Sequence, residues 1–297
     1  MSVTVIGESN IDIAVKPQSG LQPNGCTPSE INIHHGGVAR NIAHNLRLLG
    51  QEVRLMSVFG GDNFAKELIE DCTKIGMDLS LSDQFKEEKS PVFLSFNDER
   101  GNVQSAASDI GLNNRMNLDW VKTKTKEINR SDFVVADTLL ASEALSHLID
   151  NVDIPVFMDA VSPKRALRIA EALKMSGKKS FYALKCNRSE ACAFSGIDDI
   201  MESARMLNSF GIQEVFVTMG ADGVVYSSAA LTMHFPALPA QVVSVTGSGD
   251  AFLAGIVYAY SLGYNGPAAI PIGLRAAQHN LESPSTVNPN LNISLFN

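Results

Sequence analysis

The amino-acid sequence predicts an α/β fold with a mostly parallel central sheet that helices cover on both faces. Apolar, strand-like runs recur at 3–7, 53–60, 133–137, 155–160, 180–187 and 214–220, and helical patterns such as 38–49, 62–75 and 200–210 stand between them. Alternation of this kind is typical of βαβ units, whose parallel strands are buried on both faces. Ligands of such sheets bind at the carboxyl ends of the strands.

Length, charge and cysteine usage narrow the class of protein. The chain has 297 residues and a formal net charge of −8, with no basic stripe, which argues against nucleic acid or a membrane surface as a partner. No apolar run reaches the roughly 20 residues of a spanning helix. The four cysteines lack a CxxC or disulfide spacing, and the N-terminus reads as a strand rather than a signal peptide. We therefore expect one domain over 1–297, with free thiols, in the cytoplasm.

Two stretches interrupt the alternation. Residues 13–35 contain three prolines and several turn formers, and residues 91–106 show a hairpin pattern that turns near Asp98 to Asn102. Together they could form a small sheet, which would be either a lid over the active site or a surface insertion. An exposed edge of such a lid could pair with a second copy of the chain to give a homodimer.

Polar side chains follow the first predicted strand. In GESNID, Asn10 and Asp12 occupy alternate positions just past the strand end, so they point the same way. Short polar groups at the end of a buried strand are well placed to bind hydroxyl groups of a ligand. Turn formation is the alternative explanation.

A pair of glycines precedes the helix predicted at 38–49. Gly36 and Gly37 end a strand-like piece, and Asn41 then falls in the first turn of the helix. The amide of Asn41 offers a donor and an acceptor, which suits the vicinal hydroxyls of a sugar. A solvated helix face is the alternative. The nearby histidines, His34, His35 and His44, have an irregular spacing for a metal site.

Two further strands end in polar or glycine-rich turns. Asn187 and Glu190 follow the strand at 180–187, where they could order Mg²⁺ and its waters or cap the next helix. In TMGADG, Gly220 and Gly223 follow the strand at 214–220 and would let a flat ligand or a phosphate approach the backbone.

The segment VTGSGDAFLAG, at 245–255, joins a predicted strand at 241–244 to a helix predicted from Asp250 to Leu262. It is neither a GxGxxG fingerprint, because Phe252 occupies the third glycine position, nor a Walker A loop. Its glycines would let N–H groups converge on an anion at the positive end of the helix. Asp250 then either stabilises the helix start or accepts the proton of a hydroxyl that attacks a bound phosphoryl group.

Taken together, GESNID, HHGGVARN, LKCNRSE, TMGADG and VTGSGDAFLAG, in this order, resemble the ribokinase-like (PfkB-type) family of sugar and nucleoside kinases. The resemblance covers essentially the whole chain. It implies a three-layer α/β/α fold with a small β-sheet lid, ATP and Mg²⁺ as cosubstrates, and phosphorylation of a primary hydroxyl of a sugar or nucleoside.

The resemblance also implies a role for each motif residue. Asp250 is then the catalytic base, and Gly247, Ser248 and Gly249 form the anion hole. The hydroxyl contacts are Asn10, Asp12, Gly36, Gly37 and Asn41. The nucleotide contacts are Asn187, Thr218, Gly220 and Gly223, and the metal is ordered by Glu190 and Asn187. Many relatives carry an aspartate that helps hold a monovalent cation where this chain has Ser244, so a requirement for K⁺ stays open.

The acceptor is less well defined by these residues. The hydroxyl contacts suit a ribose-containing substrate, and the base of a nucleoside would need further polar contacts, which Asn32, His34, Ser95 and Ser105 of the two lid segments offer. Ribokinase, fructokinase or another sugar or nucleoside kinase of the family is the alternative, and a non-catalytic sugar-binding regulator is a second one. Asp250 together with both glycines favours an enzyme.

Overall fold

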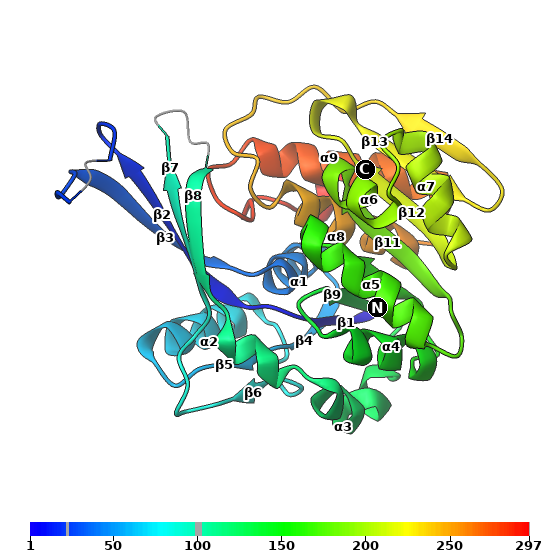
Figure 1. Ribbon diagram of the computed structural model, residues 1–297, viewed down its shortest axis with the longest axis horizontal. Coiled ribbons are helices and arrows are strands. Elements are labelled where there is room, and N and C mark those ends of the chain that lie inside the picture. Colours follow the sequence, from blue (N-terminus) through cyan, green and yellow to red (C-terminus); the bar gives the residue numbers. More distant parts are fainter. Residues whose placement is uncertain (22–23, 99–102, 297) are drawn as a thin grey trace.

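The computed structural model describes residues 1–21, 24–98 and 103–296. Its centre is an eight-stranded sheet of order β14-β13-β12-β11-β10-β9-β1-β4 (Figure 1). The parallel strands are β1 (Ser2–Ile6), β4 (Glu52–Met56), β9 (Phe133–Asp137), β10 (Val156–Asp159), β11 (Phe181–Asn187) and β12 (Ile212–Thr218). The antiparallel strands are β13 (Val224–Ser228) and β14 (Thr232–Phe235). The predicted α/β class and mostly parallel sheet are confirmed.

Helices cover both faces of this sheet (Figure 1). One layer contains α1 (Val38–Leu48), α2 (Asn63–Ile75), α8 (Ser248–Ser261) and α9 (Ile270–Leu281). The other contains α3 (Leu118–Ile128), α4 (Ser142–Asn151), α5 (Pro163–Met175), α6 (Arg188–Ser195) and α7 (Ile200–Ser209). The helices predicted at 38–49, 62–75 and 200–210 match α1, α2 and α7 to within one residue at each end.

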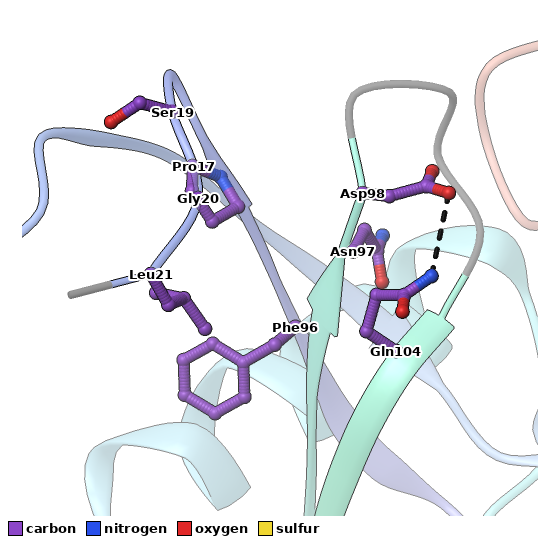
Figure 2. A pocket seen from close by; sticks show the side chains of 8 residues that line it. All are labelled: Pro17, Ser19, Gly20, Leu21, Phe96, Asn97, Asp98 and Gln104. Atoms are coloured by element: carbon purple, nitrogen blue, oxygen red, sulfur yellow. Dashed lines mark hydrogen bonds between the residues drawn. The ribbon is translucent and has the colours of Figure 1, made fainter. Parts of the chain in front are cut away.

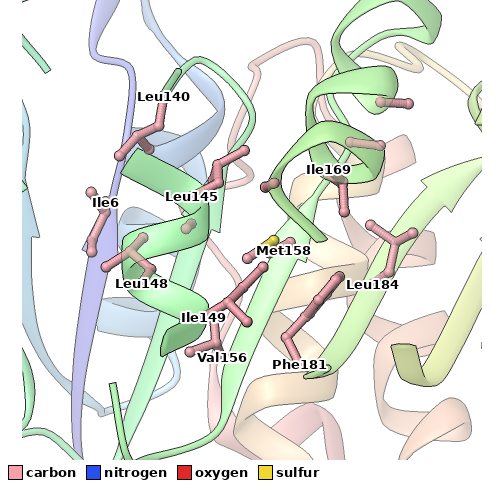
Figure 3. Packing of buried hydrophobic residues seen from close by; sticks show 14 of the residues in the cluster. Ile6, Leu140, Leu145, Leu148, Ile149, Val156, Met158, Ile169, Phe181 and Leu184 are labelled. Atoms are coloured by element: carbon pink, nitrogen blue, oxygen red, sulfur yellow. The ribbon is translucent and has the colours of Figure 1, made fainter. Parts of the chain in front are cut away.

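Successive side chains of each buried strand point to opposite faces of the sheet, so they belong to two separate hydrophobic cores. On β9, Val134 and Ala136 belong to the core under α3 to α7, whereas Phe133 and Val135 belong to the core under α1 and α8. Figure 3 shows the first core, in which side chains of α4 pack against those of β10. Because both faces are covered, the edge formed by the carboxyl ends of the strands is where the sheet remains open to a ligand.

A second, four-stranded sheet stands beside the body (Figure 1). Its order is β3-β2-β7-β8, with β2 (Asn10–Pro17), β3 (Ser29–Gly36), β7 (Val92–Asn97) and β8 (Val103–Asp109). The predicted small sheet is therefore present, although it begins at residue 10 rather than 13 and extends to 109 rather than 106. Most of the expected turn, residues 99–102, lies outside the described residues. That this sheet acts as a lid stays a prediction.

Two strand predictions were wrong in detail. The run at 53–60 is split, because the N–H of Ser57 bonds to Ser82 Oγ, and β5 (Val58–Phe59) then pairs with β6 (Asp83–Gln84) outside the main sheet. Residues 241–244 form no strand. Val242 and Val243 are 58% and 56% exposed there, and the N–H of Val243 bonds to the carbonyl of Leu281 at the end of α9. Their β-branched side chains favour a strand, but this segment docks on a helix end instead of a sheet edge.

The four cysteines are free thiols, as predicted. Within the ranges that the structure describes, no helix combines the length and the apolar character needed to cross a membrane.

Candidate active site

The residues at the open edge of the sheet line a cavity of about 680 Å³. It lies between the small sheet, the start of α1 and the start of α8. The predicted site residues that meet in its wall are Asn10, Asp12, Gly37, Asn41, Gly247 and Asp250. These residues come from three parts of the chain, so the structure brings the N-terminal motifs and the VTGSGD turn to one space. Their chemical roles remain predictions.

Asp250 is the most strongly perturbed acid of this wall. It lies in the first turn of α8, is only 8% exposed, and accepts a hydrogen bond from Asn41 Nδ2 at 2.9 Å. Burial, with the neighbouring charge of Asp159 as the next cause, raises the pKa of Asp250 to about 7. A carboxyl with a pKa near neutrality can both take up and release a proton under ordinary conditions. This arrangement is suited to general-base chemistry.

The turn before Asp250 requires its glycines. Gly247 has φ 77°, and a Cβ there would lie 1.9 Å from the carbonyl oxygen of Thr286. Ser248 and Gly249 begin α8, and Ser248 Oγ donates to the carbonyl of Val245 at 2.9 Å. Gly247 is the N-cap residue of α8, and no side chain caps the first N–H groups of this helix. These N–H groups lie in the same turn as Asp250. Anion binding by this turn is consistent with the geometry and stays a prediction.

The hydroxyl-binding residues are fitted tightly to one another. Asn10 Nδ2 donates to Asp12 Oδ1 at 2.9 Å, and a Cβ on Gly36 would lie 2.1 Å from Asp12 Oδ2. Position 36 therefore has to be glycine to leave room for the Asp12 carboxylate, and Gly36 itself does not line the cavity. Gly37 has φ 97°, and its missing side chain lets the start of α1 pack directly against the carbonyl of Glu8.

Two amide oxygens in this wall are left without partners. Asn10 Oδ1 and Asn41 Oδ1 are buried, and neither has a hydrogen-bond partner among the described residues. Buried polar atoms are nearly always paired in folded proteins, so each unpaired acceptor calls for an explanation. Asn10 Oδ1 faces Gly36, where a Cβ would lie 2.6 Å from it, so this oxygen packs against backbone rather than toward the cavity.

Asn187 and Glu190 form a capping box at the start of α6. Asn187 Oδ1 accepts from the N–H of Glu190 at 2.9 Å, and Glu190 Oε2 accepts from the N–H of Asn187 at 2.7 Å. The described residues contain no group of three or more histidine, cysteine or acidic side chains that could hold a metal. The geometry thus shows the helix-capping alternative directly. A metal role for this pair would have to be one of ordering waters around substrate phosphates.

The predicted nucleotide residues gather one strand further along. Thr218 ends β12 directly beside Asn187 of β11, and Gly220 and Gly223 follow at φ 60° and 89°. A Cβ on Gly223 would lie 2.0 Å from the carbonyl oxygen of Phe235, whereas one on Gly220 would meet open space. None of these four lines the cavity at Asp250. They lie at neighbouring strand ends, where the donor nucleotide is predicted to bind.

The register of the small sheet corrects one of the predicted base contacts. Residues opposite one another share a face, and Asp12 pairs with His34 and Phe93, while Ser105 pairs with Phe96 on the other face. Ser105 therefore points away from the cavity. Asn32 and Ser95 share the face of Asp12, but along with His34 they lie outside the cavity lining, to which the small sheet contributes Asn10, Asp12, Phe93 and Ser108.

Sequence patterns also missed several charged residues in and beside the cavity. Glu8 lines the cavity and accepts from Asn113 Nδ2 at 2.8 Å, and its burial raises its pKa to about 7, with Asp137 as the next cause. Lys185 of β11 pairs with Asp159 of β10 at 3.0 Å, both of them buried. A lysine inside an otherwise apolar strand, two residues before Asn187, is the signal that could have singled out Lys185, although not its partner.

Another hollow, of about 460 Å³, lies at the far end of the small sheet (Figure 2). Leu21 and Phe96 form one side of it, and a hydrogen bond from Gln104 Nε2 to Asp98 crosses the other. It contains none of the predicted site residues. The cavity at Asp250, which holds six of them, is therefore the candidate active site.

The fold and the cavity together define a class of protein. A buried carboxyl with a pKa near 7 stands at a glycine-rich helix start and shares a cavity with the polar side chains of Asp12 and Asn41, at the carboxyl edge of a mostly parallel sheet. These are the parts that a phosphotransferase acting on a small hydroxyl-bearing compound requires.

Comparison with known proteins identifies the family. Residues 1–293 match the model of the pfkB family carbohydrate kinases, and the chain belongs to this family. It is 30% identical to the pseudouridine kinase of Escherichia coli strain K12 over 299 aligned residues. This alignment covers 98% of this chain and 94% of that protein.

Solved structures agree with this assignment. A carbohydrate kinase from Agrobacterium tumefaciens superposes with a TM-score of 0.83 at 26% identity, over 99% of this chain and 95% of that one. The ribokinase of Thermotoga maritima shares the fold, with a TM-score of 0.82 at 21% identity over 96% and 94% of the two chains. The predicted ribokinase-like fold is confirmed. The protein is a carbohydrate or nucleoside kinase, a phosphotransferase with an alcohol group as acceptor, and kinases of this family use ATP.

Proposed function

We propose that this protein transfers the γ-phosphoryl group of ATP to the 5′-hydroxyl of pseudouridine. The cavity carries the proposal. Its volume of about 680 Å³ falls within the range of small-molecule sites and leaves room for a nucleoside. The likeness to a pseudouridine kinase over nearly the whole chain favours this nucleoside over other ribose-containing acceptors. Ribose, fructose and other nucleosides are the competing acceptors.

The wall residues suggest a pose for such an acceptor. The primary hydroxyl would lie at Asp250 and the secondary hydroxyls at Asp12 and Asn41. The base would then extend toward the remaining lining, where Phe93 offers a ring for stacking and Ser108, Ser162, Lys164 and Arg165 offer hydrogen-bond donors. Glu8 adds an acceptor, which the extra ring N–H of pseudouridine could fill.

In this pose the residues support in-line transfer. Asp250 accepts the proton of the 5′-hydroxyl while the oxygen of that hydroxyl forms a bond to the γ-phosphorus of ATP. The bond between the γ-phosphorus and the β–γ bridging oxygen breaks at the same time, which releases ADP. The N–H groups of Gly247, Ser248 and Gly249 hold the charge of the transferred group. Binding of the nucleotide at Asn187, Thr218, Gly220 and Gly223 would place its phosphates along this path.

A panel of acceptors tests the proposal. We expect kcat/KM with ATP to be higher for pseudouridine than for uridine, ribose and fructose, because a site that hydrogen-bonds the extra N–H leaves its acceptor unpaired when uridine binds. A higher value for ribose or fructose would end the pseudouridine assignment and leave the family assignment intact.

We further propose Mg²⁺ as the companion of ATP, with its waters ordered by Glu190 and Asn187. Because Ser244 replaces the cation-holding aspartate of many relatives, we expect no dependence on K⁺. The same assay tests both points. Activity should vanish with EDTA and return with Mg²⁺, and should be equal in potassium and tetramethylammonium chloride.

Loss of the Asp12 carboxylate should weaken acceptor binding selectively. The change Asp12→Ala removes a partner of the ligand hydroxyls and leaves Asn10 Nδ2 unpaired, so we expect a loss of about 1–3 kcal/mol in acceptor binding with little change for ATP. Isothermal titration calorimetry with each ligand measures both. Asp78→Ala, at an exposed aspartate at the other end of the sheet, is the control. Equal losses for acceptor and ATP in Asp12→Ala would show a damaged fold instead.

The small sheet also has the features of a dimer interface. Its edge strand β3 exposes Ile31 and Ile33, which are 60% and 54% exposed on one face. We therefore expect two copies to associate through this sheet. Sedimentation velocity should show a dimer for the unaltered chain and a monomer for Ile33→Lys. A monomeric unaltered chain at micromolar concentration would contradict the expectation.

A further inference from the structure

We propose that Lys185 is a second catalytic residue of this site, whose ammonium group binds the phosphoryl group in transfer, and that Asp159 is the positioning residue that holds it there. The inference rests on the proposed function in one respect: a phosphoryl group must pass the glycine turn at the start of α8. It does not depend on which acceptor receives that group.

The pair is buried beneath the site. Lys185 Nζ lies 3.0 Å from Asp159 Oδ2, and the two side chains are 9% and 1% exposed. Taking two charges out of water is costly, and apolar residues of the same volume would often serve stability equally well. A buried ion pair is therefore weak evidence for a role in stability, and the reason for this pair has to be sought in its position.

That position is the glycine turn. A Cβ on Gly249 would lie 2.7 Å from Lys185 Nζ and 3.2 Å from Lys185 Cε, so the ammonium group rests against the backbone that begins α8. Any residue larger than glycine at 249 would occupy the space of the ammonium group. The turn and the lysine are thus fitted to each other, and an anion held by the N–H groups of the turn would meet a positive charge beside it.

The charges around Lys185 show what it can do. Its ammonium group interacts with the carboxylates of Asp159, Glu190 and Asp250. It therefore lies among the predicted base, the residue predicted to order the metal, and the turn. Negative charge that develops on the transferred phosphoryl oxygens would be stabilised by a fixed ammonium group in a site from which water is largely excluded. The proton of the acceptor still goes to Asp250, and Lys185 keeps its own protons throughout.

Asp159 connects this lysine to the acceptor side of the cavity. Its Oδ1 accepts from the N–H of Val161 at 2.9 Å while its Oδ2 holds Lys185. Val161 lines the cavity and has φ 62°, a left-handed conformation that a β-branched residue rarely adopts. One carboxylate therefore fixes both the ammonium group and the loop of the acceptor wall.

The test compares Lys185→Met and Lys185→Arg with Lys124→Met, which removes the lysine of the remote ion pair with Asp83. For Lys185→Met we expect kcat to fall by about 10²–10³-fold. The affinity for a non-hydrolysable ATP analogue, measured by calorimetry, should fall by about 10- to 100-fold. ADP and acceptor affinities should change little, since neither carries the transferred group. Lys185→Arg should recover part of both losses, and Lys124→Met should leave both unchanged.

The pH profile separates the two partners of the pair. The groups facing Asp250 are Asp12 of β2, Asn41 of α1, Asp159 of β10 and Lys185 of β11. Lys185 lowers the pKa of Asp250 and Asp159 raises it. The acid limb of kcat/KM should therefore move to higher pH in Lys185→Met and to lower pH in Asp159→Asn, and the selective loss of affinity for the ATP analogue over ADP distinguishes a phosphoryl contact from a merely structural pair.

Folding is controlled with the double variant Lys185→Met, Asp159→Asn, which leaves no unpaired buried charge. We expect it to melt near the unaltered protein while remaining as slow as Lys185→Met. Full turnover and full analogue affinity in this double variant would overturn the inference. Failure of the unaltered protein to phosphorylate any acceptor would count against the proposed function instead, and analogue binding would still test Lys185.

Discussion

Replacing Asp250 by asparagine is expected to slow turnover by a factor of about 10²–10⁴ while the protein folds and binds its acceptor normally. Asparagine has the same shape and still offers an oxygen to Asn41 Nδ2, whose bond to Asp250 spans 2.9 Å. It cannot take up the proton of an attacking hydroxyl. Single-turnover measurements of the phosphoryl step, beside acceptor binding by calorimetry, separate chemistry from binding.

The matched control is Asp119→Asn. Asp119 lies in the first turn of α3, as Asp250 does in α8, so it reports what loss of a carboxylate does to a helix start alone. We expect Asp119→Asn to change the melting temperature slightly and turnover not at all. If Asp250→Asn behaves like this control, Asp250 serves only its helix.

The pH profile of the unaltered enzyme carries the same prediction. A general base must be deprotonated, and the pKa of Asp250 is raised to about 7, first by burial. Activity should therefore be full above this value and fall as the pH decreases through it. This limb should be missing from the residual activity of Asp250→Asn.

Placing valine at Gly249 is expected to abolish measurable phosphoryl transfer. The first added carbon would lie 2.7 Å from Lys185 Nζ, and the two methyl groups of valine would reach further into the same space. The atom that must give way is the end of a flexible side chain, so we expect the fold to survive and the ammonium group to be displaced. Turnover should fall by more than about 10²-fold, the scale of losing one group that stabilises a developing charge.

Gly177→Val is the control for this change, because the nearest atom to a Cβ at Gly177 lies 3.9 Å away. Melting curves should be similar for the two variants. Turnover of Gly249→Val above a tenth of the unaltered rate would show that the space at Gly249 is not needed for phosphoryl transfer.

The pattern of apolar residues located the parallel strands well. These strands are buried on both faces, so each gives an almost continuous apolar run whichever strands it pairs with. The pattern failed at residues 241–244, whose valines favour a strand although the segment bonds to the end of α9 and pairs with no strand. Strand propensity describes a side chain that fits a pleated surface, and only the fold decides whether such a surface is available.

The candidate site shows the same limit. Motifs singled out Asn10, Asp12, Asn41 and Asp250, because glycines and short polar residues after a strand are local signals. Lys185 and Asp159 meet only because β10 and β11 are neighbours in the sheet, and no local pattern contains that pairing. The error at Ser105 has a related cause, since its face depends on a register that a hairpin pattern does not fix.

The cavity at Asp250 exists only in the folded chain, because its wall is assembled from segments that are far apart in the sequence. A compound that fits this wall therefore binds only the folded state and stabilises it by about 2.7 kcal/mol at a hundred times its dissociation constant. Melting temperature should thus rank acceptors by how tightly they bind, without ATP and without any turnover. The stability of the fold becomes in this way a sensor for the compound that the protein phosphorylates.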